Sequence, residues 1–507
     1  MAPRTLSKSK LIAFRQCPKR LWLEIHRPEL RQDSSSTQAS FNIGFQVGDI
    51  AQQIYDPLKI GHMIDIKTEG FTGAFTRTKT LLESNQPIFE AGFLAAGALA
   101  FADVMLPIKI DGKQFWRMIE VKSSTSVKGY HRDDSSIQAY IAKKAGVPLA
   151  SISLAHIDSS WVYQGDGDYQ GLLVEYDLTD EAFSRDGEVM TWIAAAQAVS
   201  IETDEPVRNT GRHCGEPFEC GFLKYCQSKE PQAEYPVRWL PRVQAKALKA
   251  FIAQENVIDI RNIPDKLLTK QQQRVKSSTL SKEVYFNASA AAADLAEFKL
   301  PAYFLDFETI QFAVPIWKGT RPYQQITFQF SLHHITQAGE ISHHSFLDLS
   351  GKDPSEAFAK KLIEVCGTDG AVFVYNAGFE MARIRELANR LPELKLPLLA
   401  INKRIVDLLP IARQHYYHPS QRGSWSIKKV LPAVAPDLSY GELEGVQDGG
   451  MAMTAFLEAI STTDQIRKNQ IEQQLIKYCE LDTYAMVRLW QFFSGDSNIV
   501  HKTKEIT

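Results

Sequence analysis

The chain has 507 residues, of which 44% are apolar and 23% charged, and its formal net charge is -2. This composition is typical of a folded globular protein and excludes a disordered chain or a uniformly basic nucleic-acid coat. The sequence shows no signal peptide, no apolar run of ~18 residues and only six cysteines, too few for a secreted disulfide scaffold. We therefore expect a cytoplasmic protein with no membrane partner.

The length predicts about three units, at roughly 150 residues each. The apolar pattern changes twice, which predicts an N-terminal domain over 1–228, a helical connector over 229–299, a C-terminal domain over 300–495 and a polar tail over 496–507. Short β-rich runs between helical patterns predict a mixed N-terminal domain, and alternating strands and helices predict an α/β layer fold in the C-terminal one. In the connector, Asn287 is expected to cap an alanine-rich helix.

Two neighbouring predicted strands of the N-terminal domain carry acids and a lysine. Asp103 lies on the first strand, and Glu120 and Lys122 lie two residues apart on the second, so that both point to one face. Carboxylates that hold a divalent ion beside an ammonium group suit phosphodiester hydrolysis. The alternative is a solvated hairpin, because acids and lysines are common on exposed strands.

Further polar residues flank this pair of strands. Glu90 precedes it, and Gln138 follows on a predicted helix. In this order the residues resemble the RecB-like branch of the PD-(D/E)XK nuclease superfamily, over about residues 5–228. The resemblance implies a restriction-endonuclease-like fold and metal-dependent cleavage of DNA. It implies that Asp103 and Glu120 bind Mg or Mn, and that the catalytic residues are Lys122, Gln138 and Glu90.

Four cysteines are expected to bind a metal or cluster. One is near the N-terminus, and three follow much later with five residues between neighbours: Cys17, Cys214, Cys220 and Cys226. Zinc sites usually use closer C-x2-4-C pairs, whereas an iron–sulfur cluster accepts wider spacing; zinc and four unrelated buried thiols are the alternatives. The arrangement resembles RecB-like iron–sulfur nucleases, including the CRISPR-associated adaptation exonucleases, which implies a 4Fe-4S cluster. Cys366 and Cys479 are expected to be core residues.

A second set of acids lies in the C-terminal domain. Asp306 and Glu308 lie two apart on a predicted strand, and Glu380 follows a later strand at the start of a helix. Tyr478 and Asp482 share one face of a predicted helix at i,i+4 spacing. Four acids around two divalent ions form a phosphoryl-transfer site.

This series resembles the DEDD family of 3'-5' exonucleases, which are DnaQ-like with a ribonuclease H-like fold, over about residues 300–495. The tyrosine indicates the DEDDy subgroup. The resemblance implies that Asp306, Glu308 and Asp482 bind metal, that Glu380 occupies the acid position of the second motif, and that Tyr478 orients the attacking water. Because the family normally has Asp in place of Glu380, Asp407 is a candidate supporting acid.

Other patterns carry weaker hypotheses. Aromatic residues lie beside basic ones in residues 416–429 and 321–325, which suits stacking on single-stranded nucleic acid with phosphate contacts. The pairs His333–His334 and His343–His344 are not expected to share an ion, because neighbours on a strand point to opposite faces.

Together these patterns predict two nucleases in one chain, an order similar to that of a prokaryotic two-nuclease family. The expected substrate is DNA, at ends or in single strands. One alternative is an RNA exonuclease. Another is a nucleic-acid-binding adaptor with degenerate sites, because residues 44–49 lack the histidine that RecB-like members often supply and Glu380 replaces an aspartate.

Overall fold

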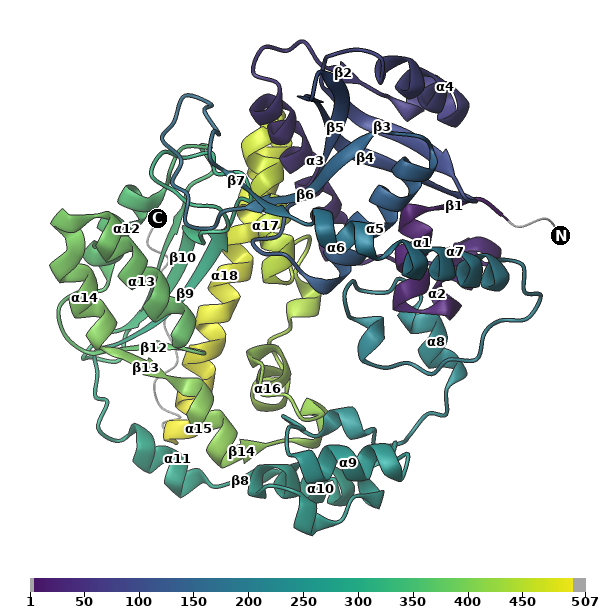
Figure 1. The fold of residues 1–507 in the computed structure, drawn as a ribbon. Helices are drawn as coiled ribbons and strands as arrows, with labels where there is room; N and C mark the ends of the chain where they lie inside the picture. The colour runs from purple at the N-terminus through teal and green to yellow at the C-terminus, as the bar shows by residue number, and fades with distance from the viewer. Residues whose placement is uncertain (1–3, 496–507) are drawn as a thin grey trace. The chain divides into compact units, whose positions relative to one another are not determined.

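The computed structural model describes residues 4–495, and the polar tail expected over 496–507 lies outside them. The chain forms two compact units. The first extends to Pro231 and also contains Phe312–Gln324, and the second contains Gln232–Gln311 and the chain from Gln325 onward. Both are mixed α/β structures, as expected (Figure 1). None of the described helices combines the length and apolar character needed to cross a membrane.

The first unit is built on a seven-stranded sheet. Its order is β2-β3-β4-β5-β6-β7, with β1 beside β4. The strands are β1 Leu6–Ser7, β2 His62–Met63, β3 Ile88–Ala95, β4 Ala98–Ile110, β5 Lys113–Lys122, β6 Leu149–Ile157 and β7 Leu173–Asp177. The turn from β4 to β5 contains Asp111 and Gly112, both with positive φ, as a tight hairpin between right-twisted strands requires.

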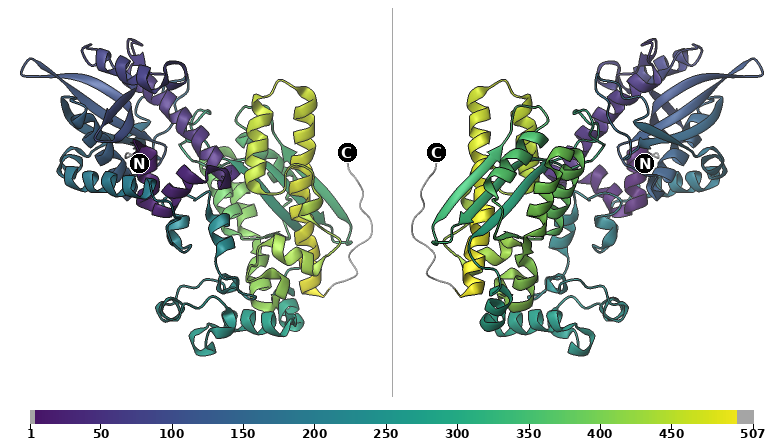
Figure 2. Two further views of the ribbon diagram at one scale, coloured as in Figure 1. Left: turned by 90° about the vertical axis from the view of Figure 1, so that its right-hand side faces the viewer. Right: turned by 90° about the vertical axis from the view of Figure 1, so that its left-hand side faces the viewer.

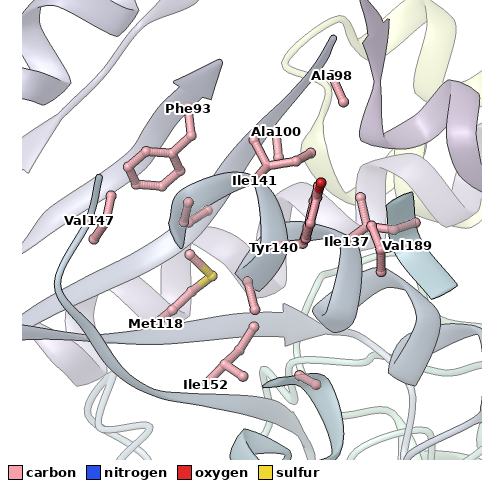
Figure 3. Packing of buried hydrophobic residues seen from close by; sticks show 14 of the residues in the cluster. Phe93, Ala98, Ala100, Met118, Ile137, Tyr140, Ile141, Val147, Ile152 and Val189 are labelled. Carbon is pink, nitrogen blue, oxygen red and sulfur yellow. The ribbon is translucent and has the colours of Figure 1, made fainter. Parts of the chain in front are cut away.

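Helices pack against this sheet and form the core of the unit. They are α1 Lys8–Gln16, α2 Pro18–His26, α3 Ser35–Tyr55, α4 Ile66–Leu81, α5 Gly129–Lys144, α6 Thr179–Ser184, α7 Asp186–Ser200 and α8 Leu223–Lys229. The central one is α5, which connects the parallel strands β5 and β6. Ile137 and Ile141 of α5 are fully buried and belong to one apolar core with Met118 and Ile152 of the sheet (Figure 3).

The second unit contains a five-stranded sheet in the order β11-β10-β9-β12-β13. Its strands are β9 Ala302–Ile310, β10 Ile326–Ile335, β11 Ile341–Leu347, β12 Ala371–Val374 and β13 Ile405–Asp407. Helices α12 Ser355–Val365, α13 Gly378–Arg390 and α14 Lys395–Lys403 share a core with one face of β9, through Leu305 and Phe307. The 30-residue helix α18, Gln465–Ser494, covers the other face (Figure 2). Alternate residues of β9 therefore face α18.

The expected connector belongs to the second unit. It forms α9 Lys246–Gln254, α10 Lys270–Ser281 and α11 Ala288–Leu295, and the predicted cap is confirmed because Asn287 Oδ1 accepts the N–H of Ala290. Strand β8, Tyr285–Phe286, pairs with β14, Tyr416–Tyr417. Leu248, Val275 and Leu295 lie in one core with Trp490 of α18, because each of these helices has an apolar face to bury. The remaining helices are α15 Leu408–His415, α16 Ile427–Val434 and α17 Gly449–Ser461.

Residues 312–324, which connect β9 to β10, pack inside the first unit. We call this segment the insert. Its residues Ala313 and Val314 share a small core with Ile157 and Leu172. Its backbone exchanges hydrogen bonds with Tyr163, whose N–H donates to Thr320 O at 3.0 Å and whose carbonyl accepts from Gly319 N at 2.8 Å. The sequence placed the insert in the C-terminal domain, whereas its apolar side chains complete the core of the other unit.

The insert is expected to keep the N-terminal piece bound to the rest of the protein after the chain is cut between the two units. A protease site placed between Pro231 and Gln232, which are both exposed, would separate residues 1–231 from the remainder once cleaved. We expect the pieces to elute together in size-exclusion chromatography, and Val314→Asp to release them, because a charge buried without a partner is costly. Val207→Asp is the control, since Val207 is 99% exposed. Co-elution of the cut Val314→Asp protein would contradict this role.

Candidate functional site

Three carboxylates of the second unit converge where α18 crosses β9. Asp306 and Glu308 alternate with apolar residues on β9 and face α18, on which Asp482 lies. One oxygen from each lies within 4.8 Å of the others. Tyr478 is one helical turn before Asp482 and is also buried. The structure therefore brings together four of the residues singled out in the sequence, including the i,i+4 pair.

Glu380 also belongs to this region. It lies in the first turn of α13, directly after β12, and is 3% exposed. Its Oε2 has no hydrogen-bond partner among the described residues. Burial raises the pKa of Glu380 to about 8, and its charge contributes to raising the pKa of Asp306. A buried carboxylate oxygen without a donor is costly, and a cation would satisfy it.

Burial and mutual repulsion dominate the electrostatics of the cluster. Burial, then the charges of Asp482 and Glu308, raise the pKa of Asp306 well above its usual range. Burial, then the charge of Asp482, raises the pKa of Glu308 to about 8, and burial raises that of Asp482 to about 6. The donors are all oxygens, which are the ligands of hard ions such as Mg²⁺ and Mn²⁺. The residues therefore fit a divalent ion, whose charge would stabilise the ionised carboxylates.

Three further side chains contact the cluster. The hydroxyl of Tyr440 donates to Asp482 Oδ1 at 2.6 Å, and Lys428 Nζ donates to the hydroxyl of Tyr478 at 3.3 Å. Cys479 is fully buried, as expected of a core cysteine, and its Sγ lies 3.8 Å from Asp306 Oδ2. Tyr440 was not predicted, because it lies in a short turn with no periodic pattern.

Asp407, the candidate supporting acid, has a structural role, and its charge also contributes to raising the pKa of Glu380. Its Oδ1 accepts the backbone N–H of Asn376 and of Leu409, both at 2.9 Å, and its Oδ2 accepts that of Ala377 at 3.1 Å. It caps α15 and fixes the turn that leads into α13. Its oxygens are therefore engaged by the backbone.

The candidate site of the first unit has Glu120 at its centre. Glu120 is 1% exposed and accepts hydrogen bonds from Lys122 Nζ and Gln138 Nε2. Asp103 lies on the adjacent strand β4, and its Oδ2 accepts the N–H of Val121 at 2.6 Å. The structure thus brings the predicted acids, lysine and glutamine together near the C-terminal end of β5 and the middle of β4.

Two residues that the sequence reasoning missed complete this site. Lys8 Nζ lies 2.7 Å from Glu120 Oε1 and 3.3 Å from Asp134 Oδ1, and Lys122 Nζ lies 2.7 Å from Asp134 Oδ2. Two ammonium groups and two carboxylates thus form a closed ring. Asp134 lies four residues before Gln138 on α5, so helical spacing was a usable signal for it.

Glu90 lies beside the same ring. It lies on β3 with a φ of 57°, and burial and the charge of Glu120 raise its pKa. The pKa of Glu120 rises to about 7, through burial and the charge of Asp103. The lysines oppose both shifts. This site therefore neutralises much of its own charge.

The four predicted cysteines line one pocket of the first unit. They are Cys17, Cys214, Cys220 and Cys226, and none of them forms a disulfide. Cys17 is the C-cap of α1, Cys214 and Cys220 precede α8, and Cys226 lies within α8. Burial raises the pKa of Cys226 to about 11. A metal or cluster lowers thiol pKa values by binding the thiolate, so four sulfur donors in one pocket fit such a group.

The stacking hypothesis for residues 416–429 is corrected, whereas the hypothesis for residues 321–325 stays a prediction. In residues 416–429, Tyr417 and Trp425 are 0% and 5% exposed, so they pack in the core and offer no ring to a base. In residues 321–325, the half-buried Tyr323 donates its hydroxyl to Ser123 O within the first unit, and this contact does not test stacking on its ring. The adjacent histidines of β10 point to opposite faces as expected, because His333 contacts Thr483 of α18 whereas His334 stacks on Tyr303.

Comparison with known proteins supports a relationship over part of the chain. A domain of unknown function (DUF2779) matches residues 303–426. An uncharacterized protein of Ureaplasma parvum serovar 3 (UU173) is 26% identical over 225 residues, which are 40% of this chain and 32% of that protein. An uncharacterized protein of Mycoplasma genitalium (MG366) is 30% identical over 220 residues, 38% of this chain and 32% of that protein. The aligned part of the chain thus spans about a third of each relative.

The carboxylate cluster is expected to make the metal-free protein less stable at higher pH. Because the pKa of Glu308 is raised from 4.5 to about 8, its contribution to stability is complete below pH 4.5 and is lost as pH rises towards 8. Glu308→Gln cannot ionise, so we expect it to gain on the order of 1–3 kcal/mol over the wild type at pH 8. Urea unfolding in EDTA at pH 5 and pH 8 measures this. The exposed Glu297→Gln serves as control, and equal pH dependence of Glu308→Gln and wild type would contradict the expectation.

Proposed function

We propose that the chain is a metal-dependent nuclease that hydrolyses phosphodiester bonds of DNA, and that its C-terminal unit is a 3'-5' exonuclease of the DEDDy type. The observation that carries the proposal is the convergence of carboxylate oxygens from Asp306, Glu308 and Asp482 within 4.8 Å. Glu380 supports it, because its buried Oε2 has no hydrogen-bond partner within residues 4–495. Phosphoryl transfer needs such a set of oxygen ligands, whereas a purely structural site has no need to bury mutually repelling acids.

The protein residues have separable parts in this reaction. Asp306, Glu308 and Asp482 would hold Mg²⁺ or Mn²⁺, which supplies an activated water and neutralises charge on the phosphate. Burial and the nearby acids raise the pKa of Tyr478 far above 10, so its hydroxyl keeps its proton and orients the water by hydrogen bonding. One water is consumed: its oxygen bonds to phosphorus, the bond to the 3' oxygen breaks, one proton ends on that oxygen and the other is released.

The site of the first unit supports a second activity on DNA, of the RecB-like PD-(D/E)XK type. Asp103 and Glu120 would bind the ion, with Lys122 as the catalytic lysine and Gln138 and Glu90 beside them. A metal ion there must compete with Lys8 and Lys122 for Glu120. RNA cleavage by the C-terminal unit, and an adaptor role with one or both sites degenerate, are the alternatives that the experiment below separates.

We also propose that the cysteine pocket holds a 4Fe-4S cluster. The pocket gathers four thiols from the two ends of the first unit, a set of sulfur ligands that suits such a cluster. Bound there, the cluster would staple α1 to the segment around α8.

End-labelled DNA tests the nuclease proposal. With Mn²⁺, we expect the wild type to shorten 5'-labelled single-stranded DNA from the 3' end, and Asp306→Ala to slow this at least about 100-fold, because the site loses a ligand. The exposed Asp204→Ala is the control. Loss with Asp103→Ala alone would assign the activity to the first unit, and faster degradation of RNA of the same sequence would favour the RNA alternative. If the wild type degrades neither strand with Mg²⁺ or Mn²⁺, the adaptor alternative holds.

The colour of anaerobically purified protein tests the cluster. We expect a brown solution with broad absorption near ~400 nm, lost in Cys220→Ser because one of four ligands is removed. Cys366→Ala should keep the colour, because Cys366 lies in the core of the second unit. A colourless protein with stoichiometric zinc would refute the cluster.

A further inference from the structure

Lys428 extends from the start of α16 towards the carboxylate cluster. Its side chain is half-buried, whereas that of the neighbouring Lys429 is exposed. Lys428 Nζ donates to the carbonyl of Gln447 at 2.6 Å and to the hydroxyl of Tyr478 at 3.3 Å. The two adjacent lysines therefore have different surroundings, although both belong to one helical turn.

Two tyrosine rings hold this ammonium group. Lys428 Nζ lies 4.9 Å from the ring centroid of Tyr478 and 5.0 Å from that of Tyr440. Such contacts attract a cation to the ring face. The ring of Tyr440 is itself fixed, because its hydroxyl donates to Asp482. The ammonium is thus held by residues that also contact the cluster.

The ammonium keeps a donor for a ligand. A lysine side chain has three N–H donors, and two acceptors, Gln447 O and Tyr478 Oη, are found for Lys428 within residues 4–495. Its charge also reaches the acids, because it opposes the rise in the pKa of Glu308 and of Asp482. A donor with a positive charge beside a metal-ligand set is placed to bind an anionic oxygen.

We propose that Lys428 is a catalytic residue that donates a hydrogen bond to a non-bridging oxygen of the scissile phosphate, while Tyr440 is a positioning residue that holds Lys428 and Asp482. The inference rests on the proposed nuclease function and extends it. Lys428 forms no covalent bond and keeps its protons. It neutralises charge on the phosphate, and its contact with the hydroxyl of Tyr478 fixes the direction in which that hydroxyl meets the water.

The first test is kinetic and uses the full chain with Mn²⁺ and single-stranded DNA. Under single-turnover conditions we expect Lys428→Met to slow cleavage about 100-fold or more, since loss of one charged donor to the transition state has effects of this size. Lys428→Arg should recover to within about tenfold of the wild type, because the charge and a donor remain. Lys429→Met, the matched control, should stay within about twofold. Cleavage by Lys428→Met at the wild-type rate would overturn the proposal.

The second test isolates the contact with phosphate and does not depend on cleavage. In EDTA, binding is compared for two DNAs, one with an ordinary 3'-terminal linkage and one with an uncharged methylphosphonate there. We expect Lys428→Met to weaken binding of the ordinary DNA about tenfold and of the methylphosphonate DNA less than twofold. An equal loss for both DNAs would overturn the contact.

The two tests separate the possible failures. If the wild type does not cleave DNA, the nuclease proposal fails, and the binding comparison still decides whether Lys428 meets the terminal phosphate. If the wild type cleaves and the Lys428 variants match it, the role of Lys428 alone fails. Thermal melting of Lys428→Met, with Lys428→Gln as a second replacement, shows whether a loss reflects the site or the fold.

Discussion

The placement of like charges between β9 and α18 is the constraint on which the second unit depends. Asp306, Glu308 and Asp482 are buried together, which opposes folding unless other contacts hold the helix on the sheet. Apolar packing supplies most of the contacts that hold α18 on the sheet, and polar contacts fix the register of α18 against the strands. Gln329 Nε2 donates to Leu475 O at 2.8 Å, and the hydroxyls of Ser331 and Thr483 lie 2.7 Å apart. Because these contacts flank the acids, they fix the position of α18 along the sheet and with it the position of Asp482.

The two candidate sites handle buried acids in opposite ways. In the first unit, Lys8 and Lys122 lie between Glu120 and Asp134, so charge is balanced within the protein. In the second unit, Lys428 is half-buried and its Nζ contacts Tyr478 and Gln447 instead. An external cation would therefore gain more at the second site, since it displaces no ammonium group there. This difference makes the C-terminal cluster the stronger candidate for a metal centre.

Sequence patterns correctly predicted the features that depend on residues close together in the chain. Strand alternation placed Asp306 and Glu308 on one face, and the preference of asparagine for helix starts placed Asn287. Contacts between distant residues had no such signal. Lys8 meets Glu120 across 112 residues, and the sequence marks neither as the other's partner. The two acidic series were found because their order along the chain resembles that of known families. Physical reasoning from one sequence does not show which distant residues meet in the fold.

The insert shows why domain boundaries read from the sequence failed where they did. Residues 312–324 directly follow the strand that carries Asp306 and Glu308, and a change of composition marks neither end of the segment. Its apolar residues nevertheless fill a core with Ile157 and Leu172. Tyr323 donates to the carbonyl of Ser123, which follows Lys122 in the chain. The end of β5 that bears Lys122 is thus supported by a segment covalently continuous with β9, the strand of Asp306 and Glu308. A mutation in the insert therefore acts on the first unit although its position in the sequence assigns it to the second.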